Sequence, residues 1–377
     1  NGKTSCAQWI AQALDAPGER AAVIGTLGSG LVGDMVPSGN TTPDAAALQA
    51  TLARLREQGA ASVAMEVSSH GLDQGRVNGV AFDIALFTNL TRDHLDYHGT
   101  MAAYGNAKAR LFAWPGLHAS VVNVDDAFGQ RLIDDIRTRG ARVLTYGRAN
   151  ADVRATSVMV NGDGIALDVD TPWGQGSTHV AVVGDFNVYN LLGTLGVLLA
   201  SEMSLDEALQ RLGSLTAPRG RMQRFGGSGM PTAIVDYAHT PDALDKALTA
   251  LRPIVVEGGE LVCVFGAGGD RDPGKRAQMG AIAARLADRV VITNDNPRSE
   301  DPQAIANAIA RGVREAGNRR WLVELDRGKA IRDAIAVADL GDVVLIAGKG
   351  HETYQEIGGV RTPFDDSLVA AHALASR

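Results

Sequence analysis

The chain opens on Asn1-Gly2-Lys3-Thr4-Ser5, and Gly-Lys-Thr followed by a helical pattern is how a phosphate-binding loop ends. In a complete loop of the form G-x-x-x-x-G-K-[ST], backbone N–H groups surround the phosphates, the lysine reaches the outer phosphates and the hydroxyl binds Mg²⁺. The first glycine of that pattern and the strand before it are not in this sequence. Gly-Lys-Thr alone could also be the solvated first turn of a helix, so a nucleotide site needs support from residues further along the chain.

The composition is that of a globular protein with more than one domain. A length of 377 residues predicts roughly two or three domains. A hydrophobic content of 45% with 21% charged residues is ordinary, and no apolar run approaches the ~20 residues of a membrane span. The net charge of −7 argues against a nucleic-acid surface. Cys6 and Cys263 fall in a helical and an apolar segment, which predicts buried thiols in a reducing cytoplasm.

The first half of the chain alternates helical and strand patterns. Helices are predicted at Lys3–Leu14, Ala45–Gln58, Met101–Trp114, Ala127–Arg139, Asn187–Ala200 and Leu205–Leu212. Strands are predicted at Arg20–Leu27, Ala61–Val67, Phe82–Thr88, Val121–Val124 and Arg142–Tyr146. The glycine-rich stretch 25–42 is expected to be a long loop, in which Thr42 before Pro43, together with Asp44, suits a helix cap. Short strands around the turn Asn161-Gly162-Asp163-Gly164 predict an antiparallel insertion between residues 153 and 183.

A domain boundary is predicted at Thr216–Gly220, which gives domains 1–217 and 218–377. Beyond it the alternation starts again. The predicted strands are Ala233–Asp236, Leu261–Phe265, Arg289–Thr293 and Val343–Ala347. Helical segments are predicted near Pro241–Leu251, Gly274–Leu286, Pro302–Ala316 and Gly328–Ala338. This pattern is typical of a second doubly wound α/β domain.

Three ionisable residues, Glu66, His94 and Lys108, lie at or just after predicted strand ends. In open α/β sheets this is the edge where ligands bind, and a carboxylate there commonly holds the Mg²⁺ that bridges nucleotide phosphates. Each residue also has a plainer interpretation. Glu66 could be a salt-bridged or capping carboxylate, His94 a hydrogen-bonded structural residue, and Lys108 a surface charge, since an ammonium repels a metal.

Four longer motifs resemble the Mur ligases in sequence and in order. They are Met65-Glu66-Val67-Ser68-Ser69-His70-Gly71-Leu72, Asn89-Leu90-Thr91-Arg92-Asp93-His94-Leu95-Asp96-Tyr97-His98, Asp236-Tyr237-Ala238-His239-Thr240-Pro241-Asp242 and Asp295-Asn296-Pro297-Arg298. The resemblance covers essentially the whole chain. It implies a P-loop ATPase-type central domain with an antiparallel insertion, followed by a Rossmann-like doubly wound domain.

The resemblance also implies an activity in peptidoglycan biosynthesis. The family transfers the γ-phosphoryl group of ATP to a carboxylate, and an amine attacks the resulting acyl phosphate. The implied substrates are UDP-N-acetylmuramoyl-L-alanyl-D-glutamate and meso-2,6-diaminopimelate, with Mg²⁺ as the metal. The enzyme is expected to be a cytoplasmic monomer with no nucleic-acid partner and no membrane span.

Site residues carry over from the family by matching positions. The catalytic set is Lys3, Glu66, His94 and Lys108, and the metal ligands are Thr4, Glu66, His94 and Lys108 as a carbamate derived from CO₂. The ATP-binding set is Asn1, Gly2, Lys3, Thr4, Ser5, Asn187, Asn190, Arg221 and His239. The UDP-N-acetylmuramoyl-dipeptide set is Asn40, Thr41, Thr42, Ser68, Gln74 and Arg76. The diaminopimelate set is Arg271, Asp295, Asn296, Pro297, Arg298, Gly348 and Glu352.

The sequence departs from the family pattern at its start, because the family has a further N-terminal domain that holds the uridine nucleotide. We expect the sequence to be a segment of a longer protein, and we expect that segment alone not to complete the reaction. Alternative functions are a lysine-adding tripeptide synthetase, a folylpolyglutamate synthase-like ligase and a non-catalytic nucleotide-binding module. Asp-Asn-Pro-Arg argues against the first two, and the presence of Glu66, His94 and Lys108 argues against the third.

Overall fold

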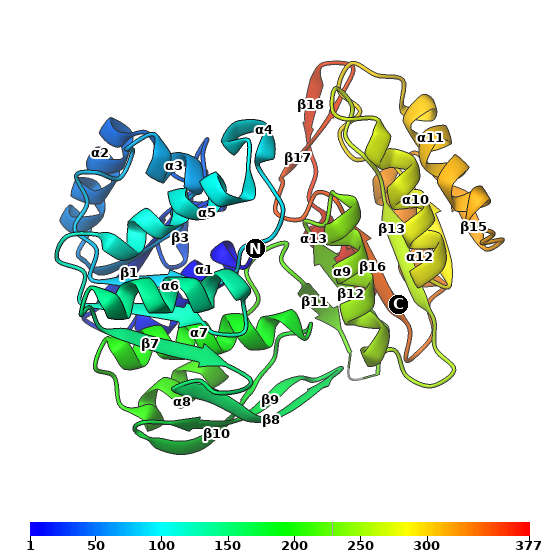
Figure 1. Cartoon of the computed structure of the whole chain (residues 1–377). Helices are drawn as coiled ribbons and strands as arrows, with labels where there is room; N and C mark the ends of the chain where they lie inside the picture. Colours follow the sequence, from blue (N-terminus) through cyan, green and yellow to red (C-terminus); the bar gives the residue numbers. More distant parts are fainter. Residues whose placement is uncertain (228) are drawn as a thin grey trace. The chain divides into compact units, whose positions relative to one another are not determined.

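A computed structural model of the chain describes residues 1–227 and 229–377, which divide into two compact units. The first unit comprises residues 1–159, 165–181 and 186–216. The second comprises residues 160–164, 182–185 and 217–377. Both units are layered α/β structures, as the alternating sequence patterns predict (Figure 1).

The first sheet of the first unit has the strand order β3-β2-β1-β4. Its strands are β1 (Arg20–Gly25), β2 (Gly28–Leu31), β3 (Asp34–Val36) and β4 (Ala60–Met65). β1 and β4 are parallel, whereas β2 and β3 are antiparallel additions at the edge. Helices α1 (Lys3–Leu14) and α2 (Ala45–Glu57) supply apolar side chains to two separate clusters. Alternate residues of β1 enter one cluster or the other, so the strand is buried on both faces.

The second sheet of this unit has the order β10-β9-β8-β7-β6-β5. Its strands are β5 (Ile84–Phe87), β6 (Ala119–Asn123), β7 (Val143–Gly147), β8 (Val153–Asn161), β9 (Gly164–Thr171) and β10 (Gly174–Val180). β5 to β8 pair in parallel, and β9 pairs with β10 in antiparallel fashion. The longer helices are α5 (Met101–Ala109), α6 (Ala127–Thr138), α7 (Phe186–Ala200) and α8 (Leu205–Gly213). Two short helices, α3 (Ser69–Asp73) and α4 (Leu95–His98), follow strand ends near the predicted site.

Several expectations for this unit need correction. The predicted loop 25–42 contains β2 and β3, because two short extended segments pair back onto β1. The predicted antiparallel insertion is confirmed, and its strands extend the same sheet because β8 pairs with β7. The expected helix 101–114 stops at Ala109 and continues as a 3₁₀ turn. Asp44, not Thr42, caps α2, with its carboxylate accepting from the Ala47 N–H at 2.9 Å.

The second unit contains a six-stranded sheet of order β11-β12-β16-β13-β14-β15. Its strands are β11 (Gln223–Gly226), β12 (Thr232–Asp236), β13 (Leu261–Phe265), β14 (Arg289–Ile292), β15 (Trp321–Val323) and β16 (Val343–Ala347). All neighbours are parallel except β11 and β12. A separate hairpin joins β17 (Tyr354–Ile357) to β18 (Val360–Pro363). β11, β15, β17 and β18 were not predicted, because strands of three or four residues carry little periodic signal.

Helices cover both faces of this sheet, so the unit is doubly wound as predicted (Figure 1). One apolar cluster contains α9 (Pro241–Leu251), α10 (Gly274–Leu286) and α11 (Pro302–Glu315). The other contains α12 (Arg327–Ala336) and α13 (Asp366–Ala375), a helix that the sequence analysis missed. The central strands β13 and β16 are buried throughout. The loops after the parallel strands therefore meet at one edge of the sheet, where ligands bind in this architecture.

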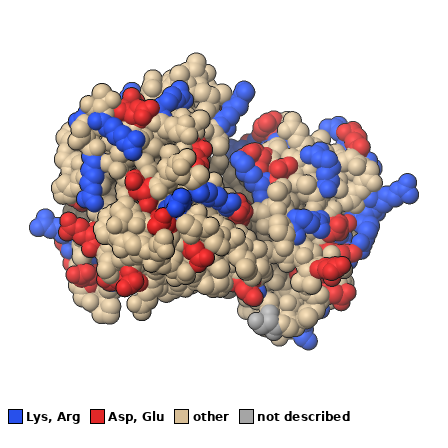
Figure 2. Space-filling model, turned by 60° about the horizontal axis from the view of Figure 1, so that its bottom comes forward, with Lys and Arg blue, Asp and Glu red and all other residues tan. Residues whose placement is uncertain are grey.

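The surface shows no single dominant charge on the face drawn in Figure 2, where acidic and basic side chains are interspersed. Within residues 1–227 and 229–377, no helix combines the length and the apolar character needed to span a bilayer.

Candidate active site

The predicted phosphate loop ends in a backbone turn that only glycine accommodates easily. Gly2 has φ 80°, and a Cβ atom there would lie 2.3 Å from the side-chain oxygen of Asn190. Asn190 is buried in α7 and also donates from Nδ2 to Asn187 Oδ1 at 2.8 Å. The start of α1 is thus held against α7 by close packing. The structure brings three predicted ATP-site residues together here.

The next contact joins the loop to β4. Thr4 Oγ1 donates to Glu66 Oε2 at 2.9 Å, and the Glu66 carboxylate is only 2% exposed. Glu66 also accepts from the Thr26 backbone N–H at 2.7 Å and from the Thr26 hydroxyl at 3.2 Å. A buried carboxylate with three donors is held in one orientation. Thr26 was not predicted, although its place at the end of a predicted strand is a signal that could have identified it.

The same network continues to the residues predicted to hold the muramoyl dipeptide. The hydroxyls of Thr26 and Thr41 lie 3.0 Å apart. Thr42 Oγ1 donates to the Glu66 backbone oxygen at 2.9 Å and accepts from the Ser68 N–H at 2.9 Å. Thr42 therefore ties the segment before α2 to the end of β4, instead of capping a helix.

Arg76 lies against the segment before α2, and three nitrogens of its guanidinium already donate hydrogen bonds. Its Nη1 donates to the Thr42 backbone oxygen at 2.8 Å, while Nε and Nη2 donate to Gln74 Oε1 at 2.9 and 2.6 Å. Gln74 Nε2 in turn donates to the Tyr97 hydroxyl at 3.3 Å. Hydrogen bonds link four of the six predicted dipeptide residues in one chain, Ser68 to Thr42, Thr42 to Arg76 and Arg76 to Gln74. The backbone oxygen of Asn40 accepts from the Ser38 hydroxyl.

His94 and Lys108 lie close to the phosphate loop. His94 caps α4 with a left-handed backbone, φ 53°, and its Nε2 lies 3.6 Å from Asp93 Oδ2. Desolvation by burial lowers the pKa of His94, and the charges of Lys3 and Lys108 lower it further against the opposing charge of Asp93. Its imidazole is thus biased towards the neutral form that binds metals.

Burial lowers the pKa of Lys108 to about 7, and the charge of Lys3 adds to the shift. Its Nζ lies 4.9 Å from the centre of the Tyr104 ring. At neutral pH a large share of Lys108 is therefore an uncharged amine with a free electron pair. This amine cannot be the simple surface cation of the plainer interpretation.

These residues fit a magnesium–nucleotide complex better than a metal held by protein alone. Among the described residues, no three His, Cys, Asp or Glu side chains form a metal-binding cluster. Mg²⁺ in nucleotide sites commonly needs only one or two protein oxygens, because phosphates and waters complete its shell. The Thr4 hydroxyl beside the Glu66 carboxylate supplies such a pair.

In the second unit, Arg221 and His239 flank Tyr237 at the end of β12. The Arg221 guanidinium lies 4.9 Å from the Tyr237 ring centre, and the ring centres of Tyr237 and His239 are 4.5 Å apart. Next to them, Asp236 accepts from the Met222 N–H at 2.8 Å, and burial raises the pKa of Asp236. The two predicted nucleotide residues of this unit thus share one aromatic neighbour.

The predicted diaminopimelate residues gather at the ends of β13, β14 and β16. Gly348 has φ 114°, and a Cβ atom there would lie 2.6 Å from Asp295 Oδ2. Arg298 also has a left-handed backbone, φ 54°, held by bonds from its N–H to Glu356 O at 3.0 Å and from the Gly358 N–H to its own oxygen at 2.7 Å. Such strained residues are concentrated at functional sites.

Their side chains lie within one group of loops. Arg298 Nη1 donates to the Gly269 oxygen at 2.6 Å. A Cβ atom on Gly268 would lie 3.0 Å from Arg298 Nη1 and 3.7 Å from Arg271 Cγ, so both arginine side chains lie near one backbone position. Asn296 Nδ2 donates to Glu352 Oε2 at 2.7 Å. All seven predicted residues are thus brought to one edge of the sheet.

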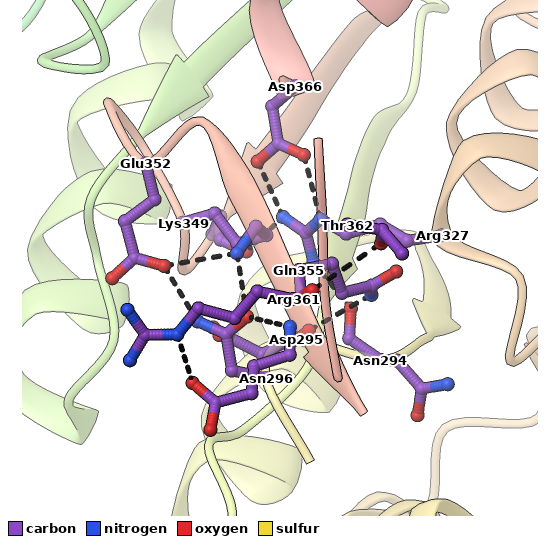
Figure 3. A network of polar contacts seen from close by, with 12 residues as sticks. Asn294, Asp295, Asn296, Arg327, Lys349, Glu352, Gln355, Arg361, Thr362 and Asp366 are labelled. Carbon is purple, nitrogen blue, oxygen red and sulfur yellow. Dashed lines mark hydrogen bonds and ion pairs between the residues drawn. The ribbon is translucent and has the colours of Figure 1, made fainter. Parts of the chain in front are cut away.

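Figure 3 shows some of these residues together with three buried charged residues that were not predicted from the sequence, Arg327, Lys349 and Asp366. Arg327 and Asp366 form a fully buried ion pair with two bonds of 2.7 Å. Arg327 also donates to the backbone oxygens of Asn294 at 3.1 Å and Ala347 at 3.0 Å. Lys349 is fully buried as well, and it contacts Asn296 and Glu352. The only sequence signal for Lys349 is its place between Gly348 and Gly350 after a strand.

Known proteins resemble this chain along its whole length. The family model of the Mur ligase middle domain matches residues 1–198, and that of the Mur ligase glutamate ligase domain matches residues 220–350. The UDP-N-acetylmuramoyl-L-alanyl-D-glutamate–2,6-diaminopimelate ligase of Ralstonia nicotianae is 55% identical over 388 residues, covering 100% of this chain and 75% of that protein. The enzyme of the same name from Chromobacterium violaceum is 53% identical over 376 residues, covering 100% and 76%. A solved structure of a ligase with this name has a TM-score of 0.76 at 39% identity, covering 100% of this chain and 77% of the other.

Proposed function

The chain belongs to the Mur ligase family, and from this premise we propose that it joins meso-2,6-diaminopimelate to UDP-N-acetylmuramoyl-L-alanyl-D-glutamate. The protein is an ATP-dependent ligase that forms amide bonds, and it acts in peptidoglycan synthesis. The observation that carries the choice of amino acid is the 55% identity, across the whole chain, to a ligase named for diaminopimelate.

The chemistry requires activation of a carboxylate. Its oxygens are poor leaving groups, so we propose that the γ-phosphoryl group of ATP is first transferred to the carboxylate of the dipeptide. The amine of diaminopimelate then attacks the carbonyl carbon of the acyl phosphate, so the amide C–N bond forms, the bond to phosphate breaks and the amine loses a proton. Both steps place negative charge on crowded oxygens, where the Lys3 ammonium and the N–H groups at the start of α1 stabilise it.

Thr4 and Glu66 are the proposed magnesium ligands, since their oxygens are already in contact at 2.9 Å. Bound Mg²⁺ would neutralise charge on the β- and γ-phosphates of ATP. The two Thr26 donors hold Glu66 so that its carboxylate keeps one direction. In the first unit, Asn1, Ser5, Asn187 and Asn190 are further proposed nucleotide contacts. In the second unit, Arg221 and His239 are proposed to contact the nucleotide.

We propose that Lys108 acts as a carbamate. Its position beside Lys3 and His94 would place an ammonium against a metal, which is unfavourable. An uncharged lysine amine attacks CO₂ through its electron pair, forming an N–C bond and losing one proton. The product is a carboxylate-like group that could serve with His94 as a metal ligand. Labelling with ¹³C-bicarbonate should give a carbamate signal that is absent from Lys108→Ala.

The dipeptide substrate is assigned to the hydrogen-bonded cluster around Thr42. The Thr42 hydroxyl bonds to the backbone oxygen of Glu66, the Ser68 N–H donates to that hydroxyl, and the Thr41 hydroxyl contacts Thr26, which itself bonds to the Glu66 carboxylate. Arg76 supplies positive charge from the same cluster. Asn40 and Gln74 are the remaining members of this proposed set.

Diaminopimelate differs from lysine by one carboxylate at the far end of its side chain. Arg298 Nη1 donates to the Gly269 backbone oxygen. Within the described part of the chain, the Nε and Nη2 donors of Arg298 have no protein acceptor. A guanidinium with donors to spare can bind that carboxylate, while the ammonium of lysine would be repelled. Arg271 adds positive charge nearby, and Glu352 is proposed to bind the distal ammonium. Asp295, Asn296, Pro297 and Gly348 shape the same pocket.

The functional domains proposed are residues 1–217 for ATP and 218–377 for the amino acid. Both cysteines, Cys6 and Cys263, are free and buried, which supports a reducing compartment and hence the cytoplasm. A monomer is the proposed state in solution.

Phosphate release by the full-length protein, with ATP, the UDP-linked dipeptide and one amino acid at a time, tests this function. Release with diaminopimelate and a product mass larger by one diaminopimelate residue would support it. Preference for lysine would favour the lysine-adding enzyme, and use of a folate with glutamate would favour the folylpolyglutamate synthase. No turnover with any amino acid would favour a non-catalytic module.

A further inference from the structure

Lys349 is a buried cation for which the proposed reaction has no role so far. It follows β16, its side chain is 0% exposed, and its Nζ lies 3.0 Å from both Asn296 Oδ1 and Glu352 Oε2. Its third neighbour is the Tyr354 ring, whose centre lies 5.4 Å away. A lysine is almost never fully buried unless it is paired, so this position needs an explanation.

The contacts of Asn296 determine which way its amide points. Asn296 Oδ1 lies 3.0 Å from Lys349 Nζ and accepts from the Glu356 backbone N–H at 3.0 Å. Both of these neighbours can only donate, so the oxygen must face them. The amide nitrogen therefore faces Glu352, and it donates to Oε2 at 2.7 Å.

The contacts of Glu352 are uneven. Lys349 and Asn296 both donate to Oε2, whereas no bond to Oε1 is recorded in residues 1–227 or 229–377. The Glu352 side chain is 21% exposed, so part of this carboxylate is accessible from outside the network. Lys349, Asn296 and Glu352 form a closed triangle of hydrogen bonds (Figure 3). The triangle directs Oε2 inward and leaves Oε1 for a ligand.

We propose that Lys349 is a positioning residue for amino-acid selection, which fixes Asn296 and Glu352 so that Glu352 Oε1 receives an ammonium group of the incoming diamino acid. This inference rests on the proposed function, because it assumes that Glu352 binds that ammonium. Two cations then flank one carboxylate, one at each oxygen. Lys349 joins the loop after β14 to the loop after β16, so the two halves of the pocket keep one spacing.

The neighbouring Arg327 provides a contrast within the same network. Arg327 bonds to Asp366 and to the backbone oxygens of Asn294 and Ala347, and within the described residues it makes no hydrogen bond to a predicted ligand-binding side chain. It supports the main chain. Lys349 instead contacts two side chains of the predicted pocket, so its loss should change selection of the amino acid more than folding.

The test uses Lys349→Met in the full-length protein, which removes the ammonium and keeps an unbranched side chain. We expect KM for meso-diaminopimelate to rise about 10- to 100-fold, as is usual when an orienting partner is lost. The KM values for ATP and for the UDP-linked dipeptide should stay unchanged. The preference for diaminopimelate over 2-aminopimelate, which lacks the distal amine, should fall by a similar factor.

The matched control is Lys329→Met, because Lys329 also contacts two carboxylates, Glu324 and Asp333, but on the surface. It should leave every KM unchanged. In a Glu352→Gln background, Lys349→Met should no longer alter the preference for diaminopimelate over 2-aminopimelate, because the group through which it acts has changed. If Lys349→Met does not fold, Lys349→Gln, which keeps a donor without the charge, is measured in its place and should raise the same KM.

An unchanged KM for diaminopimelate in a folded Lys349 variant would overturn the inference. So would equal losses for ATP and diaminopimelate, since they would indicate a general structural role. Both of these results require a wild-type protein that uses diaminopimelate. A wild-type protein that accepts no diamino acid would instead overturn the proposed function, and the inference with it.

Discussion

Replacing Arg327 with methionine should strongly destabilise the second unit. The change leaves the Asp366 carboxylate, which is 0% exposed, without its two bonds of 2.7 Å. Breaking a buried ion pair by removing one partner costs about 3 to 5 kcal/mol. The backbone oxygens of Asn294 and Ala347 also lose their donors, at about 1 to 3 kcal/mol for each buried group left unsatisfied.

The total loss should be at least about 5 kcal/mol, against a typical domain stability of about 5 to 15 kcal/mol. For a unit of this size, about 5 kcal/mol corresponds to a fall in Tm of roughly 10 to 20 °C. Differential scanning calorimetry measures that fall. Hydrogen exchange detected by mass spectrometry should locate the weakening in β14, β16 and α13, which the Arg327 contacts join.

Two further variants separate the ion pair from simple loss of packing. Arg332 is exposed on the same helix, α12, so the variant Arg332→Met should change Tm little. Arg327→Met with Asp366→Leu should be more stable than Arg327→Met alone, since no unpaired charge stays buried. A loss below about 1 kcal/mol for Arg327→Met, or a double variant that loses the sum of both single changes, would refute the reasoning.

Other predictions concern the proposed site. Lys108→Ala should lose nearly all ligase activity and regain part of it with added short carboxylic acids, and near-normal phosphate release without them would contradict a carbamate role. In the unaltered protein, carbamate labelling at fixed dissolved CO₂ should rise from about pH 6 to about pH 8, because the pKa of Lys108 is lowered to about 7 and the reactive uncharged amine is present above that pH. Labelling that falls over this range would be evidence against a carbamate on Lys108. Arg298→Ala should lower kcat/KM for diaminopimelate about 30-fold or more while leaving ATP affinity unchanged in steady-state kinetics, whereas an unaltered preference over lysine would remove Arg298 from recognition. Thr42→Val keeps the side-chain shape but loses the bonds to Glu66 and Ser68, so KM for the UDP-linked dipeptide should rise about 5- to 30-fold. A rise in KM for ATP, with KM for the dipeptide unchanged, would argue for a different role.

Local patterns in the sequence were enough to predict most of the architecture. β13 and β16 have the bounds that their apolar runs predict, and α1 begins and ends where its periodicity indicates. The predicted strands also place Glu66 at the end of one strand and Asp295 and Gly348 just after two others, and parallel strands bring such residues to one edge of a sheet. The bounds of these elements and the residues at their ends depend on neighbours in the chain, so they can be predicted without the tertiary structure.

The partners of individual side chains depended on the tertiary structure. Thr42 looked like a helix cap from its neighbours, but its hydroxyl bonds to Glu66 and Ser68, which lie 24 and 26 residues away. The buried pairs of Lys349 with Asn296 and of Arg327 with Asp366 span 53 and 39 residues. A lysine or arginine in the sequence looks like a surface charge unless its partner is known, because burial of a charge is tolerated only when folding supplies that partner.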